Sequence, residues 1–271
     1  MRFILAFSVM LWLAAAPAWA QNGHAPALSA EAVLLLDADG KVLFSKNAAE
    51  DHAPASLVKL MTLYLAYEDL ESGRAQWDEP VTVSRRAADT PRYRMGLRAG
   101  EGGTEEEFVA RMNVKAGNLG LAATHFANAH GLPDPNQRTT ANDIAALIGR
   151  LVHDYPASRT VLGGKNFIYR GRVYSRRIPL FDDPGGVQAL KTGFTNEAGY
   201  NLAVAAWRAG QRFLLVVLGA QTRSLSFRDA RRLLQYGFIA NGIESGEEPR
   251  RPAPARRPAH RRSSASLATA G

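Results

Sequence analysis

The sequence predicts an α+β fold in which helices flank an antiparallel sheet. Short apolar runs separated by turn signals occur near the start and again in the last third of the chain, which indicates strands joined as hairpins. Apolar residues at helical spacing occupy the segments between and after them. The order of two strands, helices, further strands and a closing helix predicts that the first and last strands meet in one sheet.

Composition divides the 271 residues into four segments. The chain starts with a basic Arg2 and an apolar run that ends in Ala18-Trp19-Ala20, which is typical of a secretory signal peptide cleaved after Ala20. An uncleaved membrane anchor is the alternative, although the apolar run is short for a span. We expect the segments to be a signal peptide (1–20), a linker (21–28), one folded domain (29–243) and a disordered tail rich in Pro and Arg (244–271).

The domain opens with a predicted hairpin and a predicted helix. The stretch "AVLLLDADGKVLFSKNA" has two strand-like runs around Asp39-Gly40, which is a strong hairpin signal. Apolar residues then recur at helical spacing from Leu57, and Gly73 marks the expected end. This helix is apolar on most sides, so we expect it to be buried. A short strand at 81–83 and a loop at 84–103 follow.

The remaining elements continue the pattern. A helix is expected from Thr104, which forms a capping pair with Glu107, and another from "ANDIAALIGRLVHDY", which Pro156 ends. Two short strands flank Arg170-Gly171-Arg172. The last third predicts a strand in "VQALKTG", a hairpin that turns at 209–211 and a closing helix in "SFRDARRLLQYGFIA".

Composition excludes several classes of function. The chain has no cysteine, so disulfides, cysteine catalysis and thiolate metal sites are excluded. The six histidines show no metal-binding spacing, we expect structural roles for His125 and His130, and we expect no metal or cofactor. The formal charge of +8 falls to +2 without the six arginines that follow Pro249, so the basic pI describes the tail. Nucleic-acid binding needs basic residues on a folded surface, and it is not predicted.

The pair Ser56 and Lys59 has the spacing of a nucleophile and its base. Residues i and i+3 share a helix face, so the lysine amine can reach the serine hydroxyl. The main-chain N–H of a residue in the first turn has no partner in the helix and can stabilise an oxyanion. Lysine acts as a base only when it is neutral, which burial and a second cation favour. A serine cap beside an exposed lysine is the structural alternative.

Lys191-Thr192-Gly193 supplies a candidate for the second cation. It lies on a predicted strand, where the lysine could lower the pKa of Lys59 and also bind a carboxylate. Thr192 adds a hydroxyl, and Gly193 lets a ligand approach the strand closely. Each motif alone is weak. Their order, with the helix early and the strand late in the chain, favours a serine enzyme.

Several stretches make this sequence resemble the serine-type D-alanyl-D-alanine carboxypeptidases, which are low-molecular-mass penicillin-binding proteins of peptidase family S11. They cover most of residues 30–239 and are "LDADGKVLFSKNA", "PASLVKLMT", "MGLRAGE", "THFANAHGLPDP", "ALKTGFTNEAGYNLAVAA" and "RDARRLLQYGF". The resemblance implies a fold of the penicillin-binding/β-lactamase type, with an antiparallel sheet flanked by helices and a truncated helical subdomain.

The resemblance also implies roles for the candidate residues. Ser56 would form an acyl-enzyme, and Lys59 would accept its proton. Lys191 would bind the terminal carboxylate of a peptidoglycan stem peptide ending in D-Ala-D-Ala, with Thr192 and Gly193 beside it. The main-chain N–H groups of Ser56 and Phe194 would form the oxyanion hole, and β-lactams would be covalent ligands of the same serine.

One motif of that family, Ser-x-Asn, is not found. Ala116-Gly117-Asn118 lies at a suitable distance from Ser56, but its context fits the helix that follows the motif in the family. Between "LRAGE" and "TEEEFVARMN" only Gly102-Gly103 remains, so we expect a deletion. Loss of general acid–base help costs about 10²–10⁴ in rate, so the sequence favours weak or absent carboxypeptidase activity.

The sequence leaves two alternatives to an active carboxypeptidase: an inactive penicillin-binding relative, or a remnant that binds muropeptides. A β-lactamase of the same fold would need a segment that supplies a glutamate-activated water, and no segment matches.

We assign Arg177, which precedes the Lys191 strand, to the surface. The signal peptide predicts export to the periplasm or extracytoplasmic face as a soluble protein, and the tail either contacts an anionic wall or membrane surface by charge or is solvated.

Overall fold

The structure is a computed structural model that describes residues 26–77, 105–169, 171–183 and 186–243. The expected signal peptide, most of the linker, the strand at 81–83, the loop at 84–103, Thr104 and the tail lie outside these residues. Gly102 and Gly103, where the Ser-x-Asn segment is missing from the sequence, also lie outside them. Within the described ranges, no helix has the length and hydrophobicity needed to cross a bilayer.

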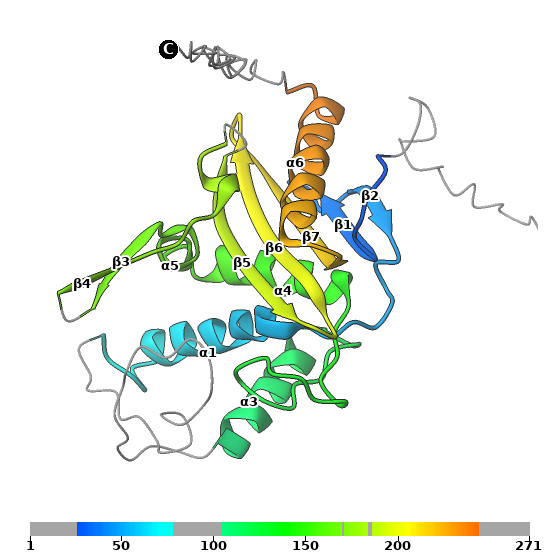
Figure 1. Cartoon of the computed structure of the whole chain (residues 1–271). Helices are drawn as coiled ribbons and strands as arrows, with labels where there is room; N and C mark the ends of the chain where they lie inside the picture. Colours follow the sequence, from blue (N-terminus) through cyan, green and yellow to red (C-terminus); the bar gives the residue numbers. More distant parts are fainter. Residues whose placement is uncertain (1–25, 78–104, 170, 184–185, 244–271) are drawn as a thin grey trace, which may run out of the picture.

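One five-stranded antiparallel sheet organises the domain, as the sequence predicts. Its strands are β1 (Ala32–Leu36), β2 (Val42–Lys46), β5 (Val187–Thr195), β6 (Gly199–Arg208) and β7 (Gln211–Ala220), in the order β2-β1-β7-β6-β5 (Figure 1). The first strand therefore pairs with the last, and β5 lies at one edge. The β6–β7 turn uses positive φ at Ala209 and Gly210, which tight two-residue hairpins require.

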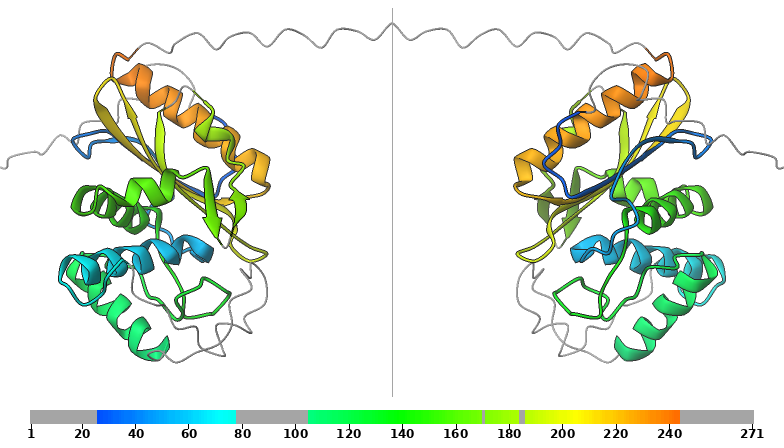
Figure 2. Two further views of the ribbon diagram at one scale, coloured as in Figure 1. Left: turned by 90° about the vertical axis from the view of Figure 1, so that its left-hand side faces the viewer. Right: turned by 90° about the vertical axis from the view of Figure 1, so that its right-hand side faces the viewer.

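Helices cover both faces of this sheet, which confirms the predicted fold class. Figure 2 shows α6 (Arg223–Ala240) on one face and α4 (Ala141–Asp154) on the other, with α1 (Lys59–Glu71) and α3 (Glu105–Asn118) beyond α4. Side chains of β7 alternate between the two resulting cores, since successive strand residues point to opposite faces. Phe213, Leu215 and Val217 join the core under α6, and Leu214, Val216 and Leu218 join the core that includes α4 and α1.

The structure corrects several element boundaries. The helix expected from Leu57 is a 3-10 turn, η2 (Ala55–Val58), followed by α1, and the closing helix begins earlier, at Arg223, where the Thr222 side chain caps it. The sequence did not predict α5 (Ser158–Gly163) or the 3-10 turn η3 (Pro179–Phe181). The predicted strands β3 (Asn166–Tyr169) and β4 (Arg172–Ser175) form a separate two-stranded sheet.

A buried carboxylate fastens the start of the domain to α6. Asp229 is fully buried, and its Oδ2 accepts hydrogen bonds from the main-chain N–H of Ser29, the hydroxyl of Ser29 and the N–H of Ala30 at 2.7, 2.7 and 3.1 Å. Hydrogen bonds to a charged acceptor are stronger than neutral ones. This clamp holds the chain in place just before β1.

We expect Asp229→Ala to lower the free energy of unfolding by about 3 kcal/mol, because it leaves one buried and two partly buried donors without an acceptor. Urea denaturation measures the loss. Glu50→Ala, at an exposed position, is the control and should change stability by no more than about 0.5 kcal/mol. Equal stability of the two variants would contradict the proposed clamp.

Candidate active site

Ser56 and Lys59 meet because the chain forms a 3-10 turn before α1. In a 3-10 helix, residues i and i+3 lie directly above one another. The Lys59 Nζ donates a hydrogen bond to the Ser56 Oγ at 3.1 Å. The same amine also donates to the main-chain oxygen of His130. The structure therefore places the serine and the lysine as the sequence predicts, with the amine held on two sides.

The turn that carries Ser56 is held from the sheet by Asn201. This asparagine lies on β6 and is almost fully buried. Its Nδ2 donates to the main-chain oxygens of Ala53 and Pro54 at 3.0 and 3.3 Å, and its Oδ1 accepts from the N–H of Gly219 at 2.9 Å. One side chain thus connects two strands to the residues that precede the serine.

Two glycines let the main chain approach this turn closely. Gly131 has φ +85°, and a Cβ at this position would lie 2.2 Å from the Ala55 oxygen. A Cβ on Gly193 would lie 3.1 Å from the Ser56 nitrogen and from the Pro54 oxygen. Ala55 itself has φ +48°, in the left-handed region that residues other than glycine seldom adopt. The loop after Phe126 and the edge strand β5 therefore enclose the serine turn.

Lys59 is less buried than the sequence predicted. Its neighbours Leu60, Met61 and Leu65 are buried, as expected for a central helix, but the Lys59 side chain is exposed. The surrounding protein still lowers the pKa of its amine by desolvation. Because the group remains accessible to water, the solvent screens part of this effect.

Lys191 carries the larger electrostatic effect. It lies on β5, and its Nζ donates to the Thr192 oxygen at 2.6 Å. Desolvation, followed by the charges of Lys59 and Arg176, lowers the pKa of Lys191 to about 7. The sequence predicted that Lys191 would lower the pKa of Lys59. In the structure, the charge of Lys59 instead lowers the pKa of Lys191, and burial alone lowers the pKa of Lys59.

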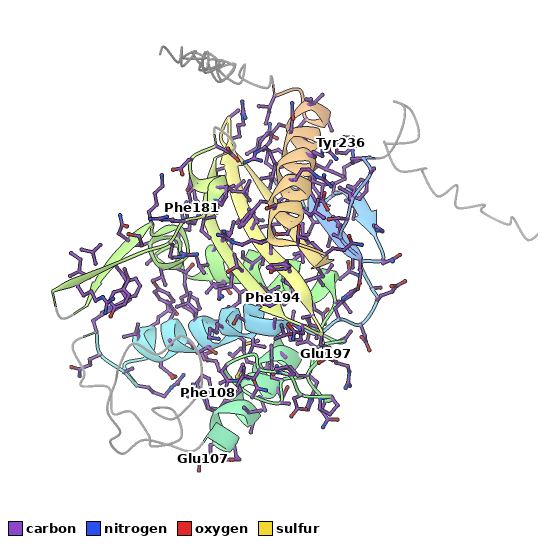
Figure 3. The ribbon with its side chains drawn as sticks, in the orientation of Figure 1. Glu107, Phe108, Phe181, Phe194, Glu197 and Tyr236 are labelled. Carbon is purple, nitrogen blue, oxygen red and sulfur yellow. The ribbon has the colours of Figure 1, made fainter. Side chains whose placement is uncertain are left out.

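The structure brings the other predicted residues to the same place. Thr192, Gly193 and Phe194 follow Lys191 on the edge strand, and β5 contacts the turn that contains Ser56. Figure 3 labels Phe194 on β5 near the beginning of α1. Its ring is partly exposed and stacks on Tyr200, with 4.2 Å between the ring centroids. All the predicted site residues therefore lie around one turn, although their chemical roles stay predictions.

Sequence reasoning missed two residues of this site. Asn201 is a polar residue inside the apolar run "YNLAVAA", and that break in the pattern could have identified it. The sequence predicted a surface position for Arg177 and made no prediction for its neighbour Arg176. The structure gives Arg177 an exposed side chain and turns Arg176 inward, toward Lys191. The two arginines are adjacent in the sequence, so no local pattern distinguishes the one that turns inward from the one that is exposed.

The fold and this site define a class. An antiparallel sheet between helices, with a serine–lysine pair under an edge strand that carries a second lysine, is the arrangement of penicillin-binding-type serine proteins. The sequence model of the D-alanyl-D-alanine carboxypeptidase family matches residues 20–101 and 98–222. The chain belongs to this family of peptidases, S11.

Individual relatives agree with this assignment. D-alanyl-D-alanine carboxypeptidase DacC of Escherichia coli is 34% identical, over 88% of this chain and 69% of its own. The structure of penicillin binding protein 6B from Escherichia coli matches with a TM-score of 0.73 and 30% identity, over 80% of both chains. Penicillin-Binding Protein D2 from Listeria monocytogenes, solved in an ampicillin-bound form, matches with a TM-score of 0.67 and 27% identity, over 80% of this chain and all of its own. The chain spans about two thirds of the length of the curated relatives.

The alignments also bear on the missing segment. The family model matches in two pieces that meet at residues 98–101. The alignment with DacC has 275 positions, more than the 271 residues of this chain, so the relative contains residues that have no counterpart here. Both facts agree with a deletion in the sequence near this point. They do not favour the impaired or inactive alternative over a carboxypeptidase, because every named relative is a carboxypeptidase or a penicillin-binding protein.

We expect Lys191 to lose its proton near pH 7 in the free protein, being charged below that pH and neutral above it. In Lys59→Met its pKa should rise, because a neighbouring positive charge is removed. NMR titration of labelled lysine side chains measures both values. Lys115→Met, whose lysine pairs with Glu68 away from this site, should leave the Lys191 titration unchanged. A wild-type value near 10.5 would show that the two amines do not interact.

Proposed function

We propose that this protein is a serine-type D-alanyl-D-alanine carboxypeptidase that removes the terminal D-alanine of peptidoglycan stem peptides. The observation that carries the proposal is the Ser56–Lys59 hydrogen bond beside the edge strand that bears Lys191. Family membership and the names of the relatives support the substrate class. The signal peptide predicted for residues 1–20 supports an extracytoplasmic location, where such peptides are found.

The first half of the reaction uses the serine and its lysine. The Ser56 Oγ attacks the carbonyl carbon of the penultimate D-alanine while its proton moves to Lys59. The main-chain N–H groups of Ser56 and Phe194 stabilise the resulting oxyanion. The C–N bond then breaks, and the leaving amine takes the proton from Lys59. The products are free D-alanine and an ester between the peptide and Ser56.

The second half restores the enzyme. A water molecule attacks the ester carbonyl and gives its proton to Lys59. The C–O bond to Ser56 breaks, and the serine oxygen recovers a proton from the lysine. The shortened peptide leaves with a new carboxylate. Lys59 takes and returns the proton in both halves, so the sequence of steps needs no residue from the missing Ser-x-Asn segment.

Lys191 links substrate binding to this chemistry. In the free protein its pKa of about 7 leaves it partly neutral. A substrate carboxylate beside the amine favours its protonated form. The resulting positive charge then disfavours a second charge on Lys59, since the two amines repel each other. Binding of the anionic end of the peptide therefore helps Lys59 to become the neutral base that Ser56 requires.

Ser56→Ala should abolish both release of D-alanine from a D-Ala-D-Ala peptide and covalent labelling by a fluorescent penicillin, because the attacking oxygen is absent. Lys59→Met should slow both by about 10²–10⁴. Ser72→Ala, at the end of α1, is the control and should behave as wild type. A penicillin adduct that persists in Ser56→Ala would contradict the assignment of the nucleophile.

Gly131→Ala should slow penicillin labelling at least about tenfold, because the new Cβ would meet the Ala55 oxygen and displace the turn that holds Ser56. Gly120→Ala is a matched control, since Gly120 also has positive φ, at +73°, but has open space around the Cβ position. An alanine at position 120 would therefore have a similar backbone strain, but its Cβ would meet no neighbouring atom. If both variants label at the wild-type rate, the Gly131 contact does not position the serine.

A further inference from the structure

Arg176 joins three elements near the proposed substrate site. It follows β4, and its Nη1 donates to the main-chain oxygens of Leu162, Gly164 and Val161 at 2.9, 3.2 and 3.3 Å. Its Nη2 donates to the Leu190 oxygen at 2.9 Å. Carbonyls at the C-terminal end of a helix have no hydrogen-bond donors within the helix, and this guanidinium supplies donors to those of α5. The same group grips β5 one residue before Lys191.

The position of the guanidinium is electrostatically unusual. It is half-buried, its four hydrogen bonds go to neutral carbonyls, and it lies over the Phe181 ring at 5.4 Å from the centroid. Burial lowers its own pKa. Among the described residues, two have positive charges that act on the Lys191 amine and lower its pKa, namely Lys59 from α1 and Arg176 from the segment after β4. A buried cation beside an amine costs stability, so the arrangement suits a site that receives an anion.

We propose that Arg176 is a positioning residue of the substrate-carboxylate site, which fixes β5 at Lys191 and holds a permanent positive charge beside the Lys191 amine. The inference rests on the proposed role of Lys191. Arginine is suited to this task because its planar fork reaches the carbonyls of α5 and of Leu190 at once. A lysine at the same position would keep the charge but could not make both sets of contacts.

Two variants separate the two contributions. Arg176→Met removes the fork and the charge, and Arg176→Lys removes the fork alone. Both should raise the KM for a D-Ala-D-Ala peptide about tenfold, with a smaller change in kcat, because β5 is no longer fixed. KM should also rise with pH as Lys191 loses its charge. Only Arg176→Met should move that rise to higher pH, because a neutral neighbour lets Lys191 keep its proton longer.

Arg177 provides the matched control. It is the next residue, its side chain is exposed, and its main-chain oxygen accepts a hydrogen bond from Arg223 at 2.7 Å. Arg177→Met should keep the wild-type KM and pH profile. Wild-type KM and an unmoved pH profile in Arg176→Met would overturn the proposal. If that variant fails to fold, Arg176→Lys decides: a raised KM supports the proposal, and a KM within about twofold of wild type overturns it.

A separate readout distinguishes this inference from the proposed function. NMR titration of Lys191 needs no turnover, and its pKa should rise in Arg176→Met and stay near the wild-type value in Arg176→Lys. Absence of D-alanine release by the wild type would count against the proposed function only. An unchanged Lys191 titration in Arg176→Met would count against the role of Arg176, whatever the activity.

Discussion

The structure depends on one constraint, the attachment of the Ser56 turn to the sheet. The turn is short and strained, with a left-handed Ala55, and it would not hold a hydroxyl under an amine without support. Asn201 holds it from β6, and Gly193 and Gly131 let main chain pack against it. The antiparallel sheet, with β5 at its edge, brings these residues together.

Positive charge is the second constraint. The Lys59 amine contacts the Ser56 hydroxyl, and the Lys191 amine interacts with the charges of Lys59 and Arg176. None of the described hydrogen bonds of these three groups goes to a carboxylate. Such a site favours an uncharged amine when it is empty and an anion when it is filled. A peptide that ends in a carboxylate meets this requirement, so the same electrostatics select the substrate and prepare the base.

Much of this could be predicted from the sequence, because the signals were local. Asp39-Gly40 marks a hairpin, apolar spacing from Leu57 marks the central helix, and Ser56 with Lys59 lies three residues apart in any helical turn. The missed features depend on contacts between distant segments. Arg176 differs from Arg177 only by which carbonyls surround it, and α5 is too short for its periodicity to stand out. The exposure of Lys59 depends on what packs beside α1, which its own sequence does not encode.

The most direct test of this account is the identity of the residue that penicillin acylates. The full chain is incubated with penicillin, digested with trypsin and mapped by mass spectrometry, with DacC treated in parallel. We predict one penicilloyl adduct, on the Ser56 hydroxyl. An adduct on any other side chain, or an unmodified protein under conditions that fully label DacC, would contradict a serine made nucleophilic by Lys59.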